Sequence, residues 1–398
     1  MLDRPVLKAQ LTPPLALWRL PSTPSLFLLA CALSIPVVAL NPSALAGDPS
    51  IYRERVVDLL GGSLPYLESN FEHLPLAIVP MLAAWLLGGW FGSYAYTASF
   101  ALLMSGALLG TAIMLDQIGE QLHLRRVGAR WLLLAGPLFP LVLFRSDPWS
   151  VLLATAAWLA MLSGRRRRAV LWQVLAVLAK GWPVVLSAAD WVRGRRRRAL
   201  FVALTSLALF GVLLAAPGFR GARAFSGIHT DTVVGTTMAV ARVLSGEPVG
   251  RFDAAGAIYL SAPDWAVLVN ASLGIGLAGL ALLALRLPVT PMRATKLTGA
   301  LVVAVLIGSP LFSPQFVLWP TPFLAVHPWR SVRMLTLAVA SLTLVFMLGW
   351  NPMYEGSLWW LAITNLRNGL LLALGAVTAW SVGHDTRQKR RRSLVGVS

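Results

Sequence analysis

The chain has 398 residues, of which 57% are hydrophobic and only 13% are charged. This balance excludes a water-soluble globular domain with a charged surface and indicates helices that face lipid. The 34 Lys and Arg residues outnumber the 16 Asp and Glu residues, for a formal charge of +18. The arginines fall in short clusters between hydrophobic runs, which is the pattern of the positive-inside rule. We therefore expect membrane lipid, and no nucleic acid, as a partner.

The first hydrophobic run, from Ser25 to Leu40, follows Arg4, Lys8 and Arg19. Because it lacks a small-residue cleavage site, we expect a retained first transmembrane helix with a cytoplasmic N-terminus. The single cysteine, Cys31, lies in this run. One cysteine excludes an internal disulfide framework and a thiolate metal cluster, so redox chemistry is not expected.

Two further hydrophobic runs follow, Leu76 to Trp90 and Ala98 to Leu115, and then the basic residues Arg125, Arg126 and Arg130. These arginines should be cytoplasmic, and two full crossings would place them on the wrong side. One run must therefore lie flat. The first is short and bounded by proline and glycine, so we predict an interfacial helix there on the outer face.

The next segments run outward to Asp147 and back to four arginines, Arg165 to Arg168. Four more arginines, Arg195 to Arg198, follow after only 26 residues. Both clusters should be cytoplasmic, so the segment between them must enter the membrane and return. Each half of this segment, if helical, is about 17 Å long, which is roughly half to two-thirds of the thickness of the hydrocarbon core. Lys180 to Pro183 then form the tip of a short hairpin, which cannot face lipid.

The remaining runs alternate regularly, with a second outer segment at about 217–264 and a basic cytoplasmic tail at about 384–398. Counting the hairpin as two, the chain makes about 12 crossings with both termini inside. The sequence has no internal repeat and no low-complexity linker. The predicted fold is therefore one all-α, polytopic transmembrane domain spanning residues 1–398.

The first outer loop, at about 41–93, contains the densest group of polar residues. Asp48 directly follows the first helix, and Ile51 to Leu60 can form an amphipathic helix that shields it. Asp48 is our candidate functional carboxylate, although Asp before Pro is also a common N-cap. Glu72 and His73 are candidates for substrate binding, with solvated loop residues as the alternative.

Asp147-Pro148 at the next outer turn has the same two interpretations as Asp48, an N-cap or a functional carboxylate. Lys180 at the hairpin tip is costly within the membrane unless it meets an anion, and a phosphate is the natural candidate; the alternative is a snorkelling lysine.

His229 and Asp231 lie in the second outer segment, where the histidine can orient sugar hydroxyls or be an ordinary loop residue. Gln315 lies at a proline-broken helix junction, of the kind that lines cavities. Arg367, ten residues into the last hydrophobic run, can anchor a phosphate or mark the outer interface.

Four segments occur in an order that resembles a known family. They are GGSLPYLESNFEHLPLA after the Asp48 region, FRSDPWSVLLATAAWLAMLSGR, LAVLAKGWPVVLSA and LFSPQFVLWPTP. Together they cover roughly residues 40–325. They resemble the bacterial polyprenol-phosphate-mannose-dependent mannosyltransferases of glycosyltransferase family 87, which have the GT-C fold.

This resemblance implies an inverting glycosyltransferase of the bacterial plasma membrane, with its active site on the outer face. The enzyme would move a sugar, most simply mannose, with arabinose as an alternative, from a polyprenyl phosphate to a hydroxyl of a glycolipid or glycan. Asp48 would be the catalytic base, Lys180 would hold phosphate with Arg367 as a second candidate, and Tyr66 would belong to the substrate site. The hydrophobic segment after Leu74 would border the prenyl groove. We expect no cofactor besides the donor lipid, with a divalent metal ion as the open alternative.

No GxxxxGK[ST] or HExxH motif is present, so ATP-driven transport and zinc-peptidase activity lack support. The main alternative is a secondary transporter or flippase of a lipid-linked or small polar substrate, because such proteins also use broken helices and buried charges. The missing internal repeat and the acids in outer loops argue against this alternative.

Overall fold

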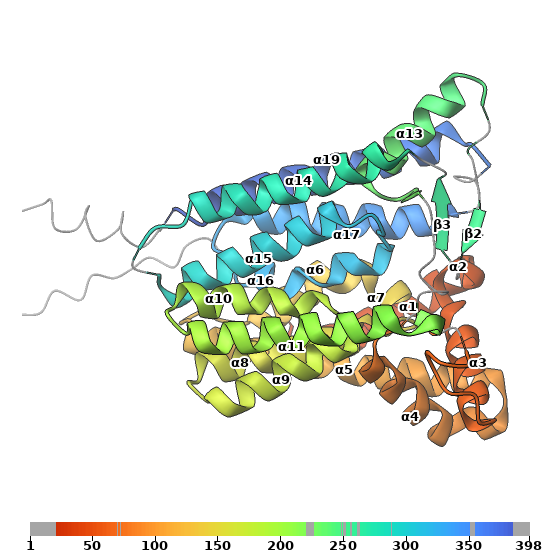
Figure 1. Ribbon diagram of the computed structural model, residues 1–398, viewed down its shortest axis with the longest axis horizontal. Helices are drawn as coiled ribbons and strands as arrows, with labels where there is room; N and C mark the ends of the chain where they lie inside the picture. Colours follow the sequence, from red (N-terminus) through yellow and green to blue (C-terminus); the bar gives the residue numbers. More distant parts are fainter. Residues whose placement is uncertain are drawn as a thin grey trace, which may run out of the picture.

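The computed structural model describes residues 21–69, 71, 73–219, 227–247, 249, 252–254, 257–260, 263–287, 289–350 and 355–384. In these ranges the chain is almost entirely helical, and most helices run along the long axis of the molecule (Figure 1). The helices of the first half are α1 (Thr23–Leu40), α2 (Pro42–Ala46), α3 (Asp48–Leu60), η1 (Pro75–Ala77), α4 (Ile78–Gly88), η2 (Gly89–Phe91), α5 (Ser93–Gln121), α6 (Val127–Ala135), η3 (Gly136–Leu138), α7 (Phe139–Val142), α8 (Asp147–Leu162), α9 (Arg166–Ala179), η4 (Trp182–Val185), α10 (Leu186–Val192) and α11 (Arg196–Ala215).

The second half adds more long helices and a small sheet that the sequence did not predict. Strand β3 lies between β1 and β2 and pairs antiparallel with both. The elements are β1 (Ile228–His229), α13 (Val233–Leu244), β2 (Phe252–Ala254), β3 (Ala257–Leu260), α14 (Asp264–Leu283), α15 (Pro291–Gly308), η5 (Pro314–Leu318), α16 (Thr321–Ala325), α17 (Arg330–Leu348) and α19 (Leu358–Ser381).

Seven of the described helices are long and hydrophobic enough to span a membrane: α1, α5, α11, α14, α15, α17 and α19. Shorter hydrophobic helices cover Pro75–Phe91, Val127–Val142, Asp147–Leu162 and Val233–Leu244. Many large hydrophobic side chains on these helices are exposed, including Leu207 of α11 and Ile275 of α14. Exposed hydrophobic surface of this kind needs lipid around it. The prediction of an all-α membrane protein is therefore confirmed.

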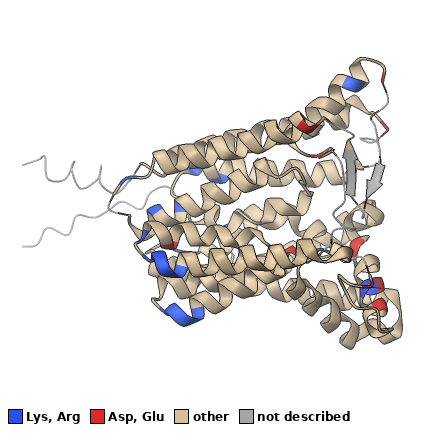
Figure 2. Cartoon of the chain, viewed as in Figure 1, with Lys and Arg blue, Asp and Glu red and all other residues tan. Residues whose placement is uncertain are grey.

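Charge is sorted between the two ends of the molecule. One end holds the loops between α5 and α6, α8 and α9, and α10 and α11, where most of the ribbon coloured blue for Lys and Arg in Figure 2 lies. We call it the basic end. The opposite end, which we call the acidic end, holds α3 and α13 and most of the ribbon coloured red for Asp and Glu. The segregation inferred from the sequence is thus a property of the folded chain.

The short hairpin is formed as predicted. Helix α9 ends at Ala179, Lys180 is its C-cap in an extended conformation, and η4 and α10 lead back to the basic end. The hairpin is packed against other helices, since α9 contacts α8 and α11 while α10 contacts α11 and α15. Its tip therefore lies among protein segments, as a polar apex within a membrane requires.

Helix α4 lies beside α3 at the acidic end (Figure 1) and packs on α3 and α5. Its buried face includes Met81 and Ala84, which share a hydrophobic cluster with Tyr52 and Phe100. The opposite face leaves Leu86 and Leu87 exposed, followed by Trp90 and Phe91. This one-sided burial is what a helix lying along a membrane surface would have.

Candidate functional site

Asp48 is held by two side chains at the start of α3. Its Oδ1 lies 2.8 Å from Nη1 of Arg145, and its Oδ2 accepts a hydrogen bond of 3.1 Å from the hydroxyl of Tyr52. A second nitrogen of Arg145, Nη2, donates to the backbone oxygen of Ala44. Arg145 is buried, whereas the Asp48 side chain is 30% exposed. The carboxylate therefore has a fixed orientation and an open side.

Asp147 lies two residues after Arg145 and forms a second ion pair. Its Oδ1 accepts a 2.8 Å bond from Nζ of Lys180 and a 2.6 Å bond from Nε1 of Trp319. Asp147 is 1% exposed, and its Oδ2 is buried with no hydrogen-bond partner among the described residues. The Lys180 side chain is 22% exposed, so part of its ammonium is accessible.

Neither aspartate caps its helix through its side chain. Asp48 and Asp147 are the first residues of α3 and α8, and the N-caps Gly47 and Ser146 make no side-chain cap bond. The capping interpretation of both aspartates is therefore not what the structure shows. Each carboxylate instead forms an ion pair with a cation from another segment of the chain. Burying such a pair costs desolvation free energy, which helix capping alone would not require.

The two ion pairs belong to one electrostatic group. Burial raises the pKa of Tyr52 well above its usual value of 10, and the negative charges of Asp48 and Asp147 raise it further. Arg145 acts on the same hydroxyl in the opposite direction. Tyr52 thus remains a protonated donor to Asp48. Three segments, around residues 48, 145–147 and 180, meet here at the acidic end.

Aromatic rings pack around the Lys180 side of this group. The ammonium lies 4.5 Å from the ring centre of Phe316 and 5.4 Å from that of Trp319. Trp319 stacks on Trp182 with 5.8 Å between ring centres. Gln315, a predicted site residue, precedes Phe316 in η5 and is half-buried, with no hydrogen bond to a described residue.

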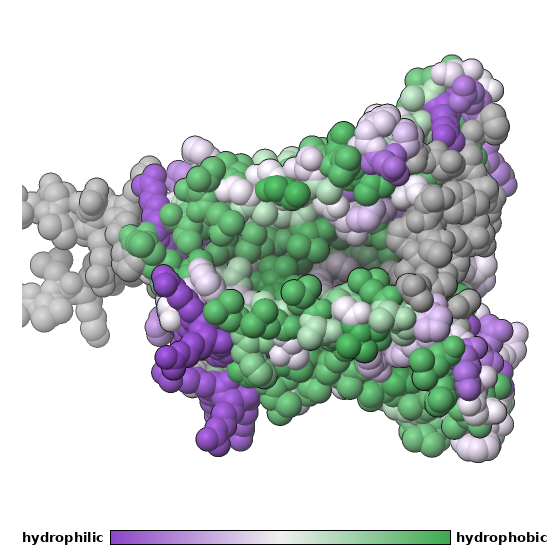
Figure 3. Space-filling model, viewed as in Figure 1, coloured by the Kyte–Doolittle hydropathy of each residue, from purple (hydrophilic) through white to green (hydrophobic). Residues whose placement is uncertain are grey.

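A hydrophobic hollow opens on the face drawn in Figure 3, between α14 and α11. Both helices expose large aliphatic side chains: Leu204, Leu207 and Val212 on α11, and Leu268 and Ile275 on α14. Helix α11 also contacts the hairpin, because a Cβ on Gly181 would meet Phe210. Helix α11 therefore borders the hollow and also contacts the hairpin that carries Lys180.

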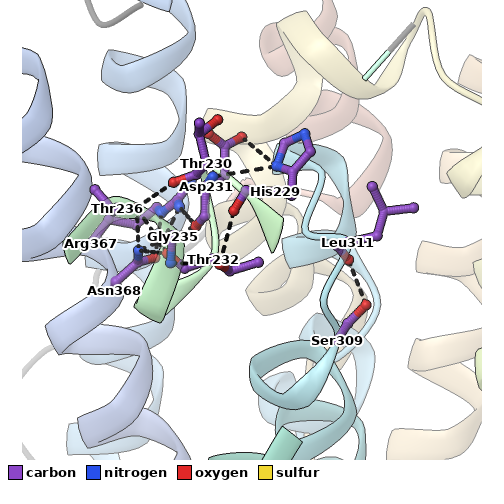
Figure 4. A network of polar contacts seen from close by, with 10 residues as sticks. All are labelled: His229, Thr230, Asp231, Thr232, Gly235, Thr236, Ser309, Leu311, Arg367 and Asn368. Atoms are coloured by element: carbon purple, nitrogen blue, oxygen red, sulfur yellow. Dashed lines mark hydrogen bonds and ion pairs between the residues drawn. The ribbon is translucent and has the colours of Figure 1, made fainter. Parts of the chain in front are cut away.

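The predicted residues His229, Asp231 and Arg367 form a separate buried network (Figure 4). Nη2 of Arg367 donates to the backbone oxygen of Asp231 at 2.6 Å, and Asn368 donates to the backbone oxygens of Asp231 and Thr232. Arg367 is completely buried. In this arrangement it ties the segment between β1 and α13 to α19, so its visible role is to hold that loop.

His229 is fixed within the same network. Its Nδ1 lies 3.7 Å from Oδ2 of Asp231, and its backbone N–H donates to the oxygen of Pro310. Burial, and then the charge of Arg367, lower the pKa of His229 from 6.5 to about 3. The imidazole is therefore neutral at physiological pH despite its acidic neighbour.

Two predicted residues of the first outer loop are part of its internal packing. The hydroxyl of Tyr66 donates to the backbone oxygen of His73 at 2.7 Å, and the His73 ring packs on Tyr52 at 5.3 Å between ring centres. His73 thus reaches the Asp48 group through Tyr52, whereas Tyr66 shapes the loop. Glu72 lies outside the described residues.

Sequence reasoning missed Arg145 and Tyr52. Arg145 lies in the segment FRSDPW, directly before Ser146-Asp147-Pro148. The positive-inside rule makes arginine uncommon at an outer turn, so its presence there was a signal that it has a specific role. Tyr52 is four residues after Asp48, the spacing that brings side chains together on a helix.

Among the described residues, no group of three or more His, Cys, Asp or Glu side chains is arranged to hold a metal ion. What the acidic-end group offers is a fixed carboxylate, a buried acceptor, an accessible ammonium and aromatic walls. Comparison with models of known protein families finds no match, and comparison with curated proteins finds no significant similarity.

Proposed function

We propose that the chain is an inverting glycosyltransferase that moves a sugar, most simply mannose, from a polyprenyl phosphate to a hydroxyl of a glycolipid or glycan. The observation that carries the proposal is the group of Asp48, Arg145, Asp147 and Lys180 in a protein that also has a hydrophobic hollow bordered by α11. A carboxylate to take a proton, a cation to meet a phosphate and a hydrophobic path for a prenyl chain are what this reaction needs.

In the proposed reaction Asp48 accepts the proton of the acceptor hydroxyl. The freed oxygen attacks the anomeric carbon, and the bond from that carbon to the polyprenyl phosphate breaks, so the phosphate leaves with the electron pair. A carboxylate has about four lone-pair sites, and Arg145 and Tyr52 occupy two of those on Asp48. An open site therefore remains for the hydroxyl, and Arg145 and Tyr52 act as positioning residues.

Lys180 would meet the leaving phosphate. An ammonium has three N–H donors, and one of them is used by Asp147. The exposed part of Lys180 leaves the others for phosphate oxygens, which charge-assisted hydrogen bonds stabilise. The unfilled Oδ2 of Asp147 is an acceptor for a sugar hydroxyl, and Trp319 and Phe316 offer faces on which a sugar ring can pack.

The proposal includes the position in the membrane. We infer about 12 crossings, in which the shorter segments such as α6–α7, α8 and the hairpin cross with the seven long helices. The acidic end, with α3 and α4 as helices at the membrane surface, would face outward, and the basic end and both termini would face the cytoplasm. The prenyl chain would lie in the hollow between α11 and α14 and along the segment after Leu74.

The proposal is tested by replacing the base. Purified protein in lipid vesicles would receive radiolabelled polyprenyl-phosphate mannose and candidate glycolipid acceptors. Asp48→Asn should lower transfer by about 100-fold or more, since general-base catalysis contributes about 100- to 10,000-fold. Glu54→Gln, on an exposed site of the same helix, is the charge-matched control and should transfer normally. An Asp48→Asn protein as fast as wild type would remove Asp48 from the base role.

The same vesicles separate transfer from transport. A secondary transporter or flippase would move labelled lipid or a small polar substrate across the bilayer with no new glycosidic bond. Labelled donor appearing on the far side while the acceptor stays unlabelled would therefore favour the transporter and count against the transferase.

A further inference from the structure

The two arginine clusters of the basic end share one local structure. Gly164 and Gly194 have φ angles of +71° and +77°, which glycine adopts without strain. The backbone N–H of Arg165 donates to Ala160 and that of Arg195 donates to Asp190, at 3.0 and 2.8 Å. These bonds close α8 and α10 in the Schellman pattern. Each following helix then starts at once, with arginines in its first turn.

The two clusters come together in a groove of about 470 Å³. Arg166 lines it from the first cluster, and the second contributes Gly194 and Arg195 to Arg198. The two clusters approach because α9 and α11 pack on each other. Arg166 lies close enough to Arg198 for their charges to repel. Five arginine residues therefore line one open space.

Little negative charge balances this groove. Asp190 pairs with Arg195 at 3.7 Å and with Arg198. In the part of the chain that the structure describes, Arg166 and Arg197 have no acidic partner, and Arg196 packs only on the ring of Trp191. Arg166, Arg196 and Arg197 are exposed. Three unbalanced cations thus face the groove.

The N-termini of α9 and α11 also favour a bound anion. The first turns of α9 and α11 carry arginines but no acidic residue, and their N-caps make no side-chain cap bond. Unsatisfied backbone N–H groups and the positive end of the helix dipole disfavour cations there and favour a bound anion. Arginine also provides the planar donor pair that phosphate prefers.

The surface next to the groove is hydrophobic. Leu200, Phe201 and Leu204 of α11 directly follow the arginines in sequence and are 46%, 57% and 61% exposed. An acyl chain can lie along this stripe while its headgroup occupies the groove. Basic pockets beside hydrophobic helices at one membrane face are typical binding sites for anionic headgroups.

We propose that the groove formed by Arg166 and Arg195 to Arg198 binds the phosphate group of an anionic membrane lipid, with an acyl chain along α11. The site lies at the end opposite to the candidate catalytic group, and it does not rest on the proposed transferase activity.

The test uses native mass spectrometry of the purified full chain, titrated with dioctanoyl phosphatidylglycerol or with zwitterionic dioctanoyl phosphatidylcholine. We expect the anionic lipid to bind at least about tenfold more tightly. The triple variant Arg166→Gln, Arg196→Gln and Arg197→Gln should lose about tenfold or more in that affinity. These residues do not pair with Asp190, so the loops should stay folded, which intact thermal unfolding would verify.

A charge-matched variant supplies the control. Arg125→Gln, Arg286→Gln and Arg330→Gln remove the same charge from exposed sites that do not line the groove, and they should change affinity much less than the groove variant does. In a second experiment, inorganic phosphate competes with phosphatidylglycerol for the protein. Weak competition supports a lipid headgroup as the occupant, whereas phosphate binding as tightly as the lipid would mean that the groove is a site for free phosphate and would count against the proposal. Equal loss in both triple variants, or no preference for phosphatidylglycerol, would overturn the proposal.

Discussion

At the scale of single residues, the candidate site consists of charges that are stable only as pairs. Asp147 is nearly inaccessible, so its charge depends on Lys180 and on the indole N–H of Trp319. Breaking a buried pair by removing one partner leaves an uncompensated charge, whereas removing both charges costs much less. This asymmetry separates the structural role of Lys180 from the proposed phosphate-binding role.

Lys180→Met should therefore destabilise the protein by about 3 kcal/mol, the lower end of the range for a buried pair because Lys180 is partly exposed. The double variant Lys180→Met with Asp147→Asn should recover most of that loss, since Trp319 can still donate to the asparagine. Transfer activity should stay low in both. Thermal unfolding and transfer assays measure the two effects, and recovered activity in the double variant would mean that Lys180 serves only Asp147.

His229 makes folding sensitive to acid. Its folded pKa of about 3 lies below the unfolded value of 6.5, so between these values the unfolded chain binds more protons and stability rises with pH. Acidification from pH 7 to pH 5 should cost about 2 kcal/mol from this residue, at about 1.4 kcal/mol per pH unit. His229→Gln should show a smaller fall in unfolding temperature over that interval. Identical pH slopes in the two proteins would disprove the assignment.

At the scale of elements, the hairpin works because its apex is packed rather than exposed. Gly181 follows Lys180 and has an ordinary helical backbone conformation. A glycine is therefore needed here because there is no room for a side chain, not because the backbone conformation requires it. A Cβ at this position would lie 2.7 Å from the ring of Phe210 in α11. The spacing between hairpin and α11 thus sets where Lys180 stands.

Gly181→Ala should destabilise the protein by about 1–3 kcal/mol through overpacking and should lower transfer by displacing Lys180. Phe210→Leu alone should have a small effect, and it should partly rescue Gly181→Ala because it removes the clashing ring edge. The double-mutant cycle therefore predicts a favourable coupling energy of at least about 0.5 kcal/mol. Additive effects would show that the apex does not rest on Phe210.

Charge and hydrophobicity predict much of the architecture at this scale. The helix at Thr23–Leu40, the amphipathic helix after Asp48 and the hairpin with Lys180 at its apex all follow from run lengths and arginine positions. The three-stranded sheet does not, because its strands are two to four residues long. Such short strands have no period to detect and depend on pairing across the chain.

For the site, sequence reasoning located single residues but not their partners. It selected Asp48, Asp147 and Lys180, yet it considered Lys180 without its counter-ion, and it offered Arg367 as a phosphate anchor or a marker of the outer interface. The structure pairs Lys180 with Asp147 and buries Arg367 against the backbone of Asp231. Which carboxylate meets which cation depends on how separate helices pack, as with Lys180 and Asp147, which are 33 residues apart. The periodicity of a single segment carries no information about that packing.

At the scale of the whole molecule, the separation of charge between the two ends makes an orientation testable. If the basic end is cytoplasmic, as the positive-inside rule requires, a residue of the first outer loop and a residue of an arginine cluster must be accessible from opposite sides. Leu67 and Arg167 are suitable because both are exposed and neither side chain has a hydrogen-bond partner among the described residues.

Cys31 is the only cysteine, so Cys31→Ala gives a background in which one introduced cysteine is the sole target. In intact cells a membrane-impermeant maleimide should label Leu67→Cys and not Arg167→Cys, and both should react after permeabilisation. The permeabilised sample controls for reactivity, since a buried thiol would stay unlabelled there as well. Labelling of Arg167→Cys alone in intact cells would show that the protein has the opposite orientation. Asp48 and Lys180 would then lie on the cytoplasmic side, and the donor lipid would have to be in the other leaflet.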